Sequence, residues 1–169
     1  MENPANNNVA NNIIDIDLSI TNKKKFRIDH DDSRIIELNT SDMGIVGRLS
    51  SAYPKLVALQ EKSEKITLNV DLEHHEDNLE DTLNDYKTIG DRLAEVDHDM
   101  RELIDYIFDS EVSSKAAPTG SMYDLFGGVF RYEHIITTLM ELYENNLREE
   151  YEKVQAQMRK HTEKYTNHV

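Results

Sequence analysis

A heptad pattern of apolar residues between Leu79 and Phe108 is the feature that most constrains how this chain can fold. Apolar side chains recur every seven positions, with others interleaved at steps of three and four. The positions are Leu79, Tyr86, Leu93, Met100 and Ile107, with Ile89, Val96 and Leu103 between them. Because an α-helix repeats every ~3.6 residues, these spacings place the side chains on one face of a helix of about eight turns. The sequence therefore predicts one long amphipathic helix over residues 79–108.

The other face of this predicted helix is strongly acidic. Residues 71–111 hold fifteen acids against Lys87, Arg92 and Arg101, and so carry most of the net charge of −14. Affinity for a phosphate backbone comes mainly from lysine and arginine, so we expect no nucleic-acid partner. The basic run Lys23–Arg27 is better explained as a solvated hairpin turn than as a nucleic-acid contact.

Composition sets the broad class of the protein. The 169 residues are 38% hydrophobic and 31% charged, with no tryptophan and few glycines or prolines, which favours a helix-rich soluble protein. The chain has no cysteine, which excludes disulfides and thiolate chemistry. It also has neither an apolar run long enough to span a bilayer nor a recognisable secretory signal. We therefore expect no membrane partner.

The N-terminal quarter predicts an arm followed by a small sheet. Residues 1–12 contain six asparagines and few apolar side chains, which indicates a flexible arm. Apolar and polar residues alternate over 14–20 and again from Phe26 to Ile28, which predicts a β-hairpin with a polar turn at 21–24. A third short strand is predicted at 35–38, so that residues 13–40 form one small β-sheet.

Residues 41–165 are predicted to form a helical body. A first helix runs from about Asp42 to Lys65, and Pro54 predicts a kink or a break near Ser51–Tyr53. The serine-rich stretch 110–121 is predicted to be a loop. A second long helix is predicted over 131–165, with its last two turns projecting from the body, and 166–169 form a tail. The fold class is thus mainly α with a small N-terminal β-hairpin (α+β), in which two long amphipathic helices pack as an antiparallel hairpin beside a shorter helix.

The segment Met122–Phe130 is the most hydrophobic and aromatic short stretch in the chain. Its paired glycines, Gly127 and Gly128, permit a sharp turn or a close backbone approach. An apolar segment that follows a polar loop is a good candidate for recognition of another protein. The predicted partner-binding residues are Met122, Tyr123, Leu125, Phe126, Val129 and Phe130.

No arrangement of residues in the sequence points to catalysis. No serine lies in a nucleophile elbow, and the paired glycines lack the residues that complete a phosphate-binding loop. Metal-binding residue types gather at Glu73–Asp77 and at Asp97–Asp99. However, neighbouring residues on a helix point to different faces, and no second ligand cluster follows at a diagnostic spacing. We therefore predict a protein that is not an enzyme and needs no metal or cofactor.

Two stretches of this chain carry a resemblance to a known family. The order of an extended segment, Arg34–Asp42, a charged helical middle, and Phe126-Gly127-Gly128 before a long closing helix resembles the tail assembly chaperones of long-tailed bacteriophages. The resemblance implies a non-enzymatic protein of the host cytoplasm that coats the helical tape-measure protein until tail-tube subunits replace it. It also implies self-association into a homo-oligomer.

Two other functions also fit the sequence. The helices could form the permanent oligomer contacts of a virion structural or adaptor protein. Alternatively, the acidic helix could mimic nucleic acid and inhibit a host nucleic-acid-binding protein.

Overall fold

The computed structural model describes residues 23–68 and 79–166. This part of the chain contains four helices and two small antiparallel sheets. In chain order the elements are β1 (Lys23–Arg27), β2 (Ile35–Asn39), α1 (Gly44–Leu68), α2 (Leu79–Phe108), α3 (Val112–Ala116), β3 (Leu125–Phe126), β4 (Val129–Phe130) and α4 (Arg131–Thr166). The predicted class, mainly helical with a small N-terminal hairpin, is confirmed. Both predicted long helices are present, at 79–108 and from residue 131.

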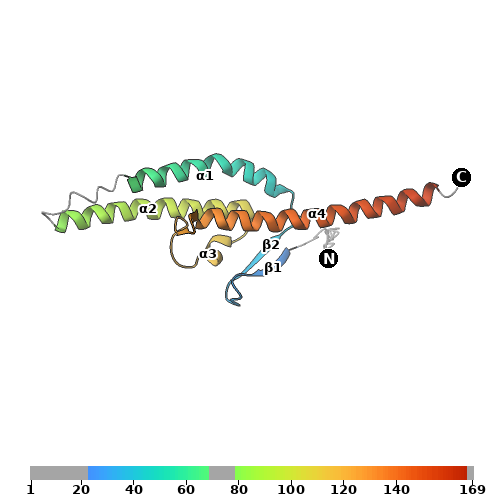
Figure 1. Cartoon of the computed structure of the whole chain (residues 1–169), viewed down its shortest axis with the longest axis horizontal. Helices are drawn as coiled ribbons and strands as arrows, with labels where there is room; N and C mark the ends of the chain where they lie inside the picture. Colours follow the sequence, from blue (N-terminus) through green and yellow to red (C-terminus); the bar gives the residue numbers. More distant parts are fainter. Residues whose placement is uncertain (1–22, 69–78, 167–169) are drawn as a thin grey trace, which may run out of the picture.

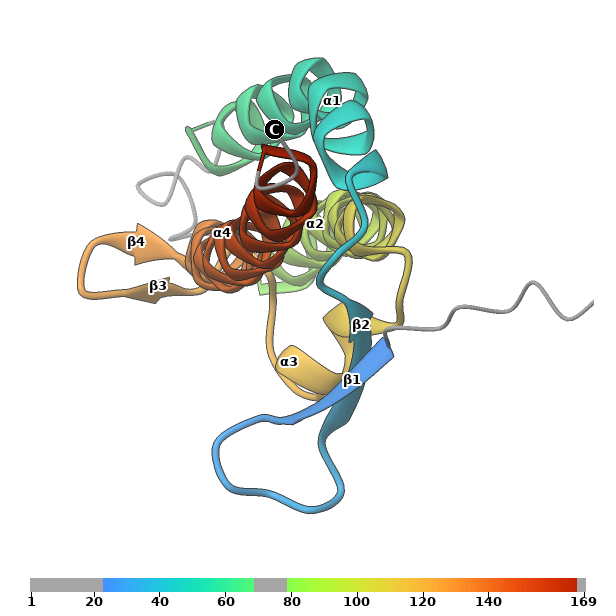
Figure 2. The same cartoon turned by 90° about the vertical axis from the view of Figure 1, so that its right-hand side faces the viewer.

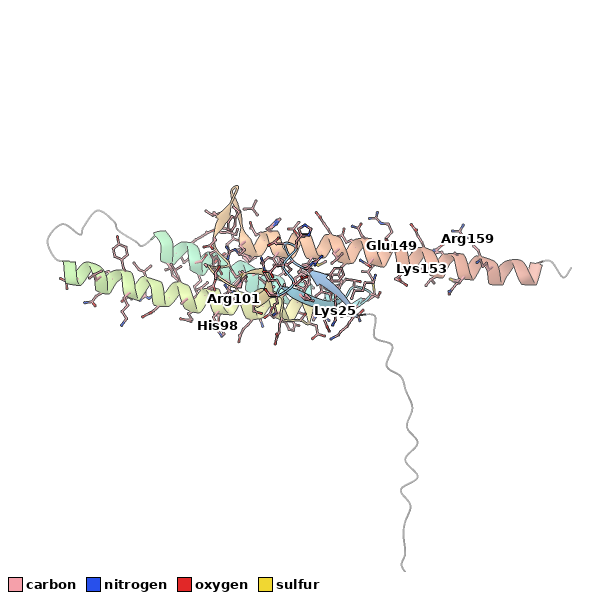
Figure 3. All side chains as sticks on the ribbon, turned by 90° about the horizontal axis from the view of Figure 1, so that it is seen from below. Lys25, His98, Arg101, Glu149, Lys153 and Arg159 are labelled. Carbon is pink, nitrogen blue, oxygen red and sulfur yellow. The ribbon has the colours of Figure 1, made fainter. Side chains whose placement is uncertain are left out.

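The molecule is elongated, with α1, α2 and α4 lying along its long axis (Figure 1). The start of α2 lies at one end and the end of α4 at the other. The two hairpins, β1–β2 and β3–β4, stand out from the helices in different directions (Figure 2). The last turns of α4 extend beyond the other elements, as predicted, and the side chains of Glu149, Lys153 and Arg159 are spread along this part (Figure 3).

The antiparallel helix pair of the fold is formed by α1 and α2. Arg48, near the start of α1, donates from Nε to the carbonyl oxygen of Ile107 at 2.8 Å, near the end of α2. Further along α1, Lys62 Nζ lies 2.9 Å from Glu95 Oε1, one carboxylate oxygen of a residue in the middle of α2. The residue numbers rise on one helix as they fall on the other, so the two helices run antiparallel.

The pairing of the two long helices differs from the expected hairpin, because α4 runs in the same direction as α2 (Figure 1). The segment 109–130 turns back along α2 until Ser121 hydrogen-bonds to Asp97. Helix α4 therefore starts beside the middle of α2. It then runs forward until the ring of Tyr143 lies 6.0 Å from that of Phe108, at the end of α2.

Helix α1 is continuous through Pro54, so the predicted break does not occur. The helix is instead gently arched in Figure 1. Its start is stabilised by Asp42, whose carboxylate accepts a hydrogen bond from the Gly44 N–H at 2.8 Å. The same carboxylate lies 2.8 Å from Nη2 of Arg48. The helix therefore begins at Gly44, two residues after the start predicted at Asp42.

The N-terminal hairpin is formed by β1 and β2, and β2 matches the short strand predicted at 35–38. Strands β1 and β2 pair with Lys23 opposite Asn39 and Arg27 opposite Ile35. Lys23, Lys24 and Lys25, which were predicted in a turn, belong to a strand. This strand lies at the exposed edge of a two-stranded sheet, so the lysine ammonium groups remain in water. The turn lies between the two strands, where Asp29 and His30 have positive φ angles. The predicted arm at 1–12 and the predicted strand at 14–20 lie outside the described residues, as does most of the predicted tail.

The predicted loop at 110–121 is wrong for its first part, where the short helix α3 forms. The Ser113 N–H and Oγ donate to the Asp105 carboxylate at 2.7 and 2.9 Å. A side chain of α2 thus caps α3, and a serine-rich composition alone could not show that. Ser113 is buried as a result.

The hydrophobic core occupies the middle of the molecule, where β2, α1, α3 and α4 meet the second half of α2. Its larger buried side chains are Leu38, Ile45, Met100, Ile104, Ile107, Phe108, Met122 and Tyr143. Both hairpins contact this core, the first through Phe26 of β1 and the second through Phe130 of β4.

Candidate partner-binding surface

The predicted binding segment folds into the hairpin β3–β4. Leu125 pairs with Phe130, and Phe126 pairs with Val129. The two residues of the turn, Gly127 and Gly128, have φ angles of 63° and 85°. Positive φ at both central positions is the geometry of a tight hairpin turn, which glycine adopts without steric cost. The glycine pair therefore fixes where this segment turns.

Three apolar side chains of the hairpin are largely exposed, and we call them the hairpin-tip surface: Leu125, Phe126 and Val129. Their exposed fractions are 62%, 59% and 44%. The Arg131 guanidinium carbon lies 5.0 Å from the centre of the Phe126 ring and orients that ring by a cation–π contact. Neighbouring exposed apolar side chains on one rigid element are typical of a protein-binding surface.

The other three predicted binding residues hold the hairpin in place. Met122 is fully buried in the core. The rings of Tyr123 and Phe130 are partly buried and meet Tyr132, with the stacked pair Phe130–Tyr132 at 5.6 Å. Sequence reasoning missed Tyr132 because it read as an ordinary position on the face of the closing helix. The predicted set therefore divides into an exposed tip and a supporting base.

Burial of the two tyrosines has an electrostatic consequence. Burial, together with nearby Glu133, raises the pKa of Tyr132 to about 12. Burial and the neighbouring Tyr132 and Asp97 also raise the pKa of Tyr123. Both phenols therefore stay protonated near neutral pH, and the base of the hairpin behaves as an apolar aromatic cluster.

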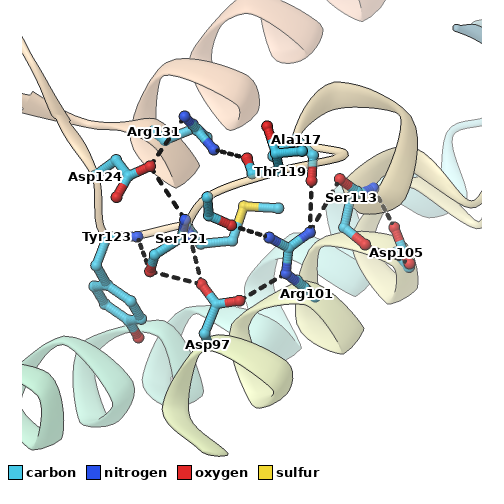
Figure 4. A network of polar contacts seen from close by, with 12 residues as sticks. Asp97, Arg101, Asp105, Ser113, Ala117, Thr119, Ser121, Tyr123, Asp124 and Arg131 are labelled. Atoms are coloured by element: carbon cyan, nitrogen blue, oxygen red, sulfur yellow. Dashed lines mark hydrogen bonds and ion pairs between the residues drawn. The ribbon is translucent and has the colours of Figure 1, made fainter. Parts of the chain in front are cut away.

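A network of polar contacts, which we call the Asp97 clamp, fastens the chain before the hairpin to α2 (Figure 4). The Asp97 carboxylate accepts hydrogen bonds from Arg101 Nε at 2.7 Å, from Ser121 Oγ at 2.8 Å and from the Met122 N–H. Arg101 also donates to the carbonyl oxygens of Ala117 and Gly120, at 2.9 and 2.7 Å. Burial raises the pKa of Asp97, but these hydrogen bonds and the Arg101 charge outweigh it, so the pKa is lowered.

A second set of contacts closes the stem of the hairpin. Arg131 Nη2 lies 3.0 Å from Asp124 Oδ2, and Arg131 Nη1 donates to the Thr119 carbonyl oxygen at 2.6 Å. The backbone N–H of Arg131 donates to the Asp124 carbonyl oxygen at 2.9 Å, and the Tyr132 N–H donates to that of Met122 at 3.0 Å. The exposed tip is thus presented from a fixed stem.

An open groove of about 550 Å³ lies beside the hairpin tip. It is bordered by the turn of the N-terminal hairpin, by α3 and the chain after it, and by the first turns of α4. Its apolar lining includes Ile28, Ile36, Val112, Phe126, Ile135 and Leu139. Arg34, Arg131 and His134 also line it, and Arg34 is fixed by the Lys115 and Ala116 carbonyl oxygens at 2.8 Å each. Phe126 therefore belongs both to the tip and to the groove.

The remaining candidates from the sequence have structural roles or lie outside the described residues. Asp97 belongs to the clamp, and the exposed His98 lies 3.3 Å from Glu102 in the next turn. The cluster Glu73–Asp77 is outside the described residues. In the described ranges, 23–68 and 79–166, no group of three or more histidines or acids could hold a metal ion. Among the same residues, no helix is both long and apolar enough to cross a membrane.

Comparisons with models of protein families, with curated proteins and with solved structures find no match to this chain. The geometry of the surface is therefore the basis for a functional proposal.

Proposed function

We propose that this protein is a non-enzymatic tail assembly chaperone of a long-tailed bacteriophage, which binds and shields the helical tape-measure protein in the host cytoplasm. The observation that carries the proposal is the hairpin-tip surface, three exposed apolar side chains presented beside an apolar groove. The sequence resemblance at 34–42 and 126–128 supports the same function.

The chemistry of such a client matches this surface. A tape-measure chain has apolar helical faces that aggregate unless they are covered. An amphipathic helix can place its apolar side chains in the groove while the tip covers the helix from one side. Covering a leucine or phenylalanine that starts largely exposed stabilises a complex by roughly 1–2 kcal/mol. A few such contacts give binding that tail-tube subunits can later reverse.

The acidic face of α2 has a separate part in this proposal. Asp85, Asp91 and Glu95 are exposed, and Glu95 is paired with Lys62 of α1. Their charge keeps the chaperone and its client dispersed, and it attracts basic client segments from a distance. The apolar surface then provides most of the affinity.

Co-purification tests the proposed contact. The protein is co-expressed with the tape-measure protein of the same phage, and the complex is isolated through a tag on the tape-measure chain. We expect Leu125→Asp and Phe126→Asp to lose the complex, because each introduces a charge into the apolar contact. Circular dichroism should show unchanged helical content, since both side chains lie on the surface.

Two control variants make the result specific. Val46→Asp changes an apolar residue of α1 that is 57% exposed and lies outside the proposed surface, so the complex should persist. Met122→Asp charges a fully buried position and should unfold the protein. Retention of the tape-measure protein by folded Leu125→Asp and Phe126→Asp would contradict the proposal.

The protein content of purified virions distinguishes a chaperone from a virion structural protein. A chaperone leaves the tape-measure protein as the tube assembles, so mass spectrometry of mature particles should not find this chain in stoichiometric amounts. Its presence in fixed copy number would favour the structural role instead.

A further inference from the structure

Helix α1 has a second apolar stripe beside the one that packs into the core. The core-facing stripe includes Ile45 and Ala52, which are completely buried. The second stripe consists of Val46, Tyr53 and Val57, which are 57%, 64% and 39% exposed. Steps of seven and four residues place these three side chains on one side of the helix, along about three turns. An exposed apolar stripe of this length is suited to packing against another helix.

This second stripe lies on the flank of α1 that faces α4. On the other flank, Arg48 and Lys62 contact residues of α2. Glu64 follows Val57 by seven residues and so shares the flank of the stripe. Burial raises the pKa of Tyr132 in α4, and after Glu133 the carboxylate of Glu64 contributes to the same shift, which places Glu64 near α4. Figures 1 and 2 both show α1 alongside the first half of α4.

Helix α4 adds apolar side chains on its own side toward α1. Ile136, Met140 and Leu147 are half-buried and continue at steps of four and seven from Tyr132. We call the combined surface the α1–α4 face, formed by Val46, Tyr53, Val57, Ile136, Met140 and Leu147. The groove beside the hairpin tip is lined by Thr138, two residues from Ile136 and Met140. Positions two apart differ by about 200° on a helix, so the groove and the α1–α4 face lie on opposite sides of α4.

The charged side chains of the α1–α4 face are acidic. Four acids lie on it: Glu61, Glu64, Glu133 and Glu144. In the described ranges, none of them forms an ion pair with a lysine or arginine. Lys65, Glu141 and Arg148 at the edge of the face bring the total to five acids and two bases. The face therefore combines an apolar centre with a negatively charged border.

We propose that the α1–α4 face binds a basic amphipathic helix of another protein, at a site separate from the hairpin-tip surface. The apolar side of such a helix packs on the stripes of α1 and α4, and lysines or arginines on its flanks meet the glutamates. A second copy of this chain fits less well, because two identical acidic faces would oppose each other. A client in the groove leaves the α1–α4 face free, so the protein binds two different helices at once.

Fluorescence anisotropy with a labelled peptide tests the proposal. The probe is a helical peptide of about 20 residues with leucines on one face and lysines elsewhere, and the control peptide has glutamates in place of the lysines. The wild-type chain should bind the lysine peptide. Tyr53→Glu and Val46→Glu should each weaken this binding by roughly tenfold or more, because each places a charge in the apolar contact. Both variants make the chain more acidic, so unspecific electrostatic attraction alone predicts tighter binding instead.

Three controls make the result specific. Leu83→Glu makes the same kind of change at an apolar residue of α2 that is 58% exposed, and it should bind the peptide like the wild type. Leu125→Asp should also keep the peptide, while Tyr53→Glu should keep the tape-measure protein. Circular dichroism should show unchanged helical content, since Val46 and Tyr53 are mostly exposed and glutamate is a good helix former.

Amide hydrogen exchange locates the bound peptide. We expect added protection over 44–60 and 133–147. Protection over 81–95 instead, equal affinity for the glutamate peptide, or unchanged affinity of Tyr53→Glu and Val46→Glu would overturn the proposal. Loss of the peptide in Leu125→Asp would place it in the groove and overturn the separate site. A wild-type dimer that Tyr53→Glu dissociates would show that a second copy covers the face.

Discussion

The two halves of α2 share one heptad pattern but have opposite environments. In the first half, Tyr86 of this pattern is 46% exposed, and Leu83, which flanks it, is 58% exposed. In the second half, Val96, Met100 and Ile104 are completely buried. The apolar period shows which face of a helix is suited to burial. The difference between the halves teaches that neighbouring elements decide whether that face is covered.

The Asp97 clamp lies close to the boundary between the two halves. The segment 109–130 turns back along α2 as far as Asp97, where Ser121 and Met122 hydrogen-bond to the carboxylate. Helix α4 begins there and runs away from the start of α2 (Figure 1). Beyond this point, α1 is the element that continues alongside α2 toward its start (Figure 1). The clamp thereby lies between the half of α2 that is buried in the core and the half whose apolar side chains are largely exposed.

The largest expected effect is the loss of core packing in the second half. Ile104→Ala removes part of a fully buried side chain, and we expect the free energy of unfolding to fall by about 2–5 kcal/mol. Urea denaturation followed by circular dichroism measures it. A loss below about 0.5 kcal/mol, the usual range for surface substitutions, would mean that the two halves do not differ as described.

A smaller effect is expected at the boundary itself. Asp97→Asn keeps the size of the side chain but removes the charge that pairs with Arg101, at a cost of about 1–3 kcal/mol. Amide hydrogen exchange should speed up most over residues 117–132, which the clamp fastens to α2. Equal acceleration throughout α1 would show that Asp97 supports the whole core rather than the hairpin.

The same carboxylate predicts a dependence of stability on pH. The pKa of folded Asp97 lies below the ordinary value of 3.8, so the unfolded chain takes up this proton first as the pH falls. The stabilisation is complete above pH 3.8 and is lost as the pH falls from there through the folded pKa. The difference in unfolding free energy between the wild type and Asp97→Asn should therefore be constant near neutrality and shrink below pH 3.8. A difference that stays unchanged in acid would contradict this role.

The smallest effect is expected in the exposed half. Leu83→Ala should change the free energy of unfolding of the monomer by less than about 0.5 kcal/mol, because the side chain is already mostly in water. The measurement is made at low protein concentration and compared with Ile104→Ala. A large loss there would show that the first half of α2 is covered within the monomer.

Local patterns were sufficient to predict several parts of this protein. The heptad spacing gave the bounds of α2, and a similar spacing gave the start of α4, because helical periodicity is a property of neighbouring residues. The paired glycines marked the turn of the binding segment, since positive φ is a local requirement. The pattern within 122–130 could not show which of its residues are buried: Met122 enters the core, while Leu125 and Phe126 stay exposed.

The sequence by itself determined the long helices, their apolar faces and the acidic charge of the middle of the chain, because each depends on residues within a few turns of one another. The tertiary structure decided which face is covered, which helix is the antiparallel partner of α2, and which aromatic residues reach the surface. Those outcomes rest on contacts between distant residues, such as Asp97 with Ser121 and Arg48 with Ile107. A long-range contact depends on where the intervening chain turns, and periodicity does not record that.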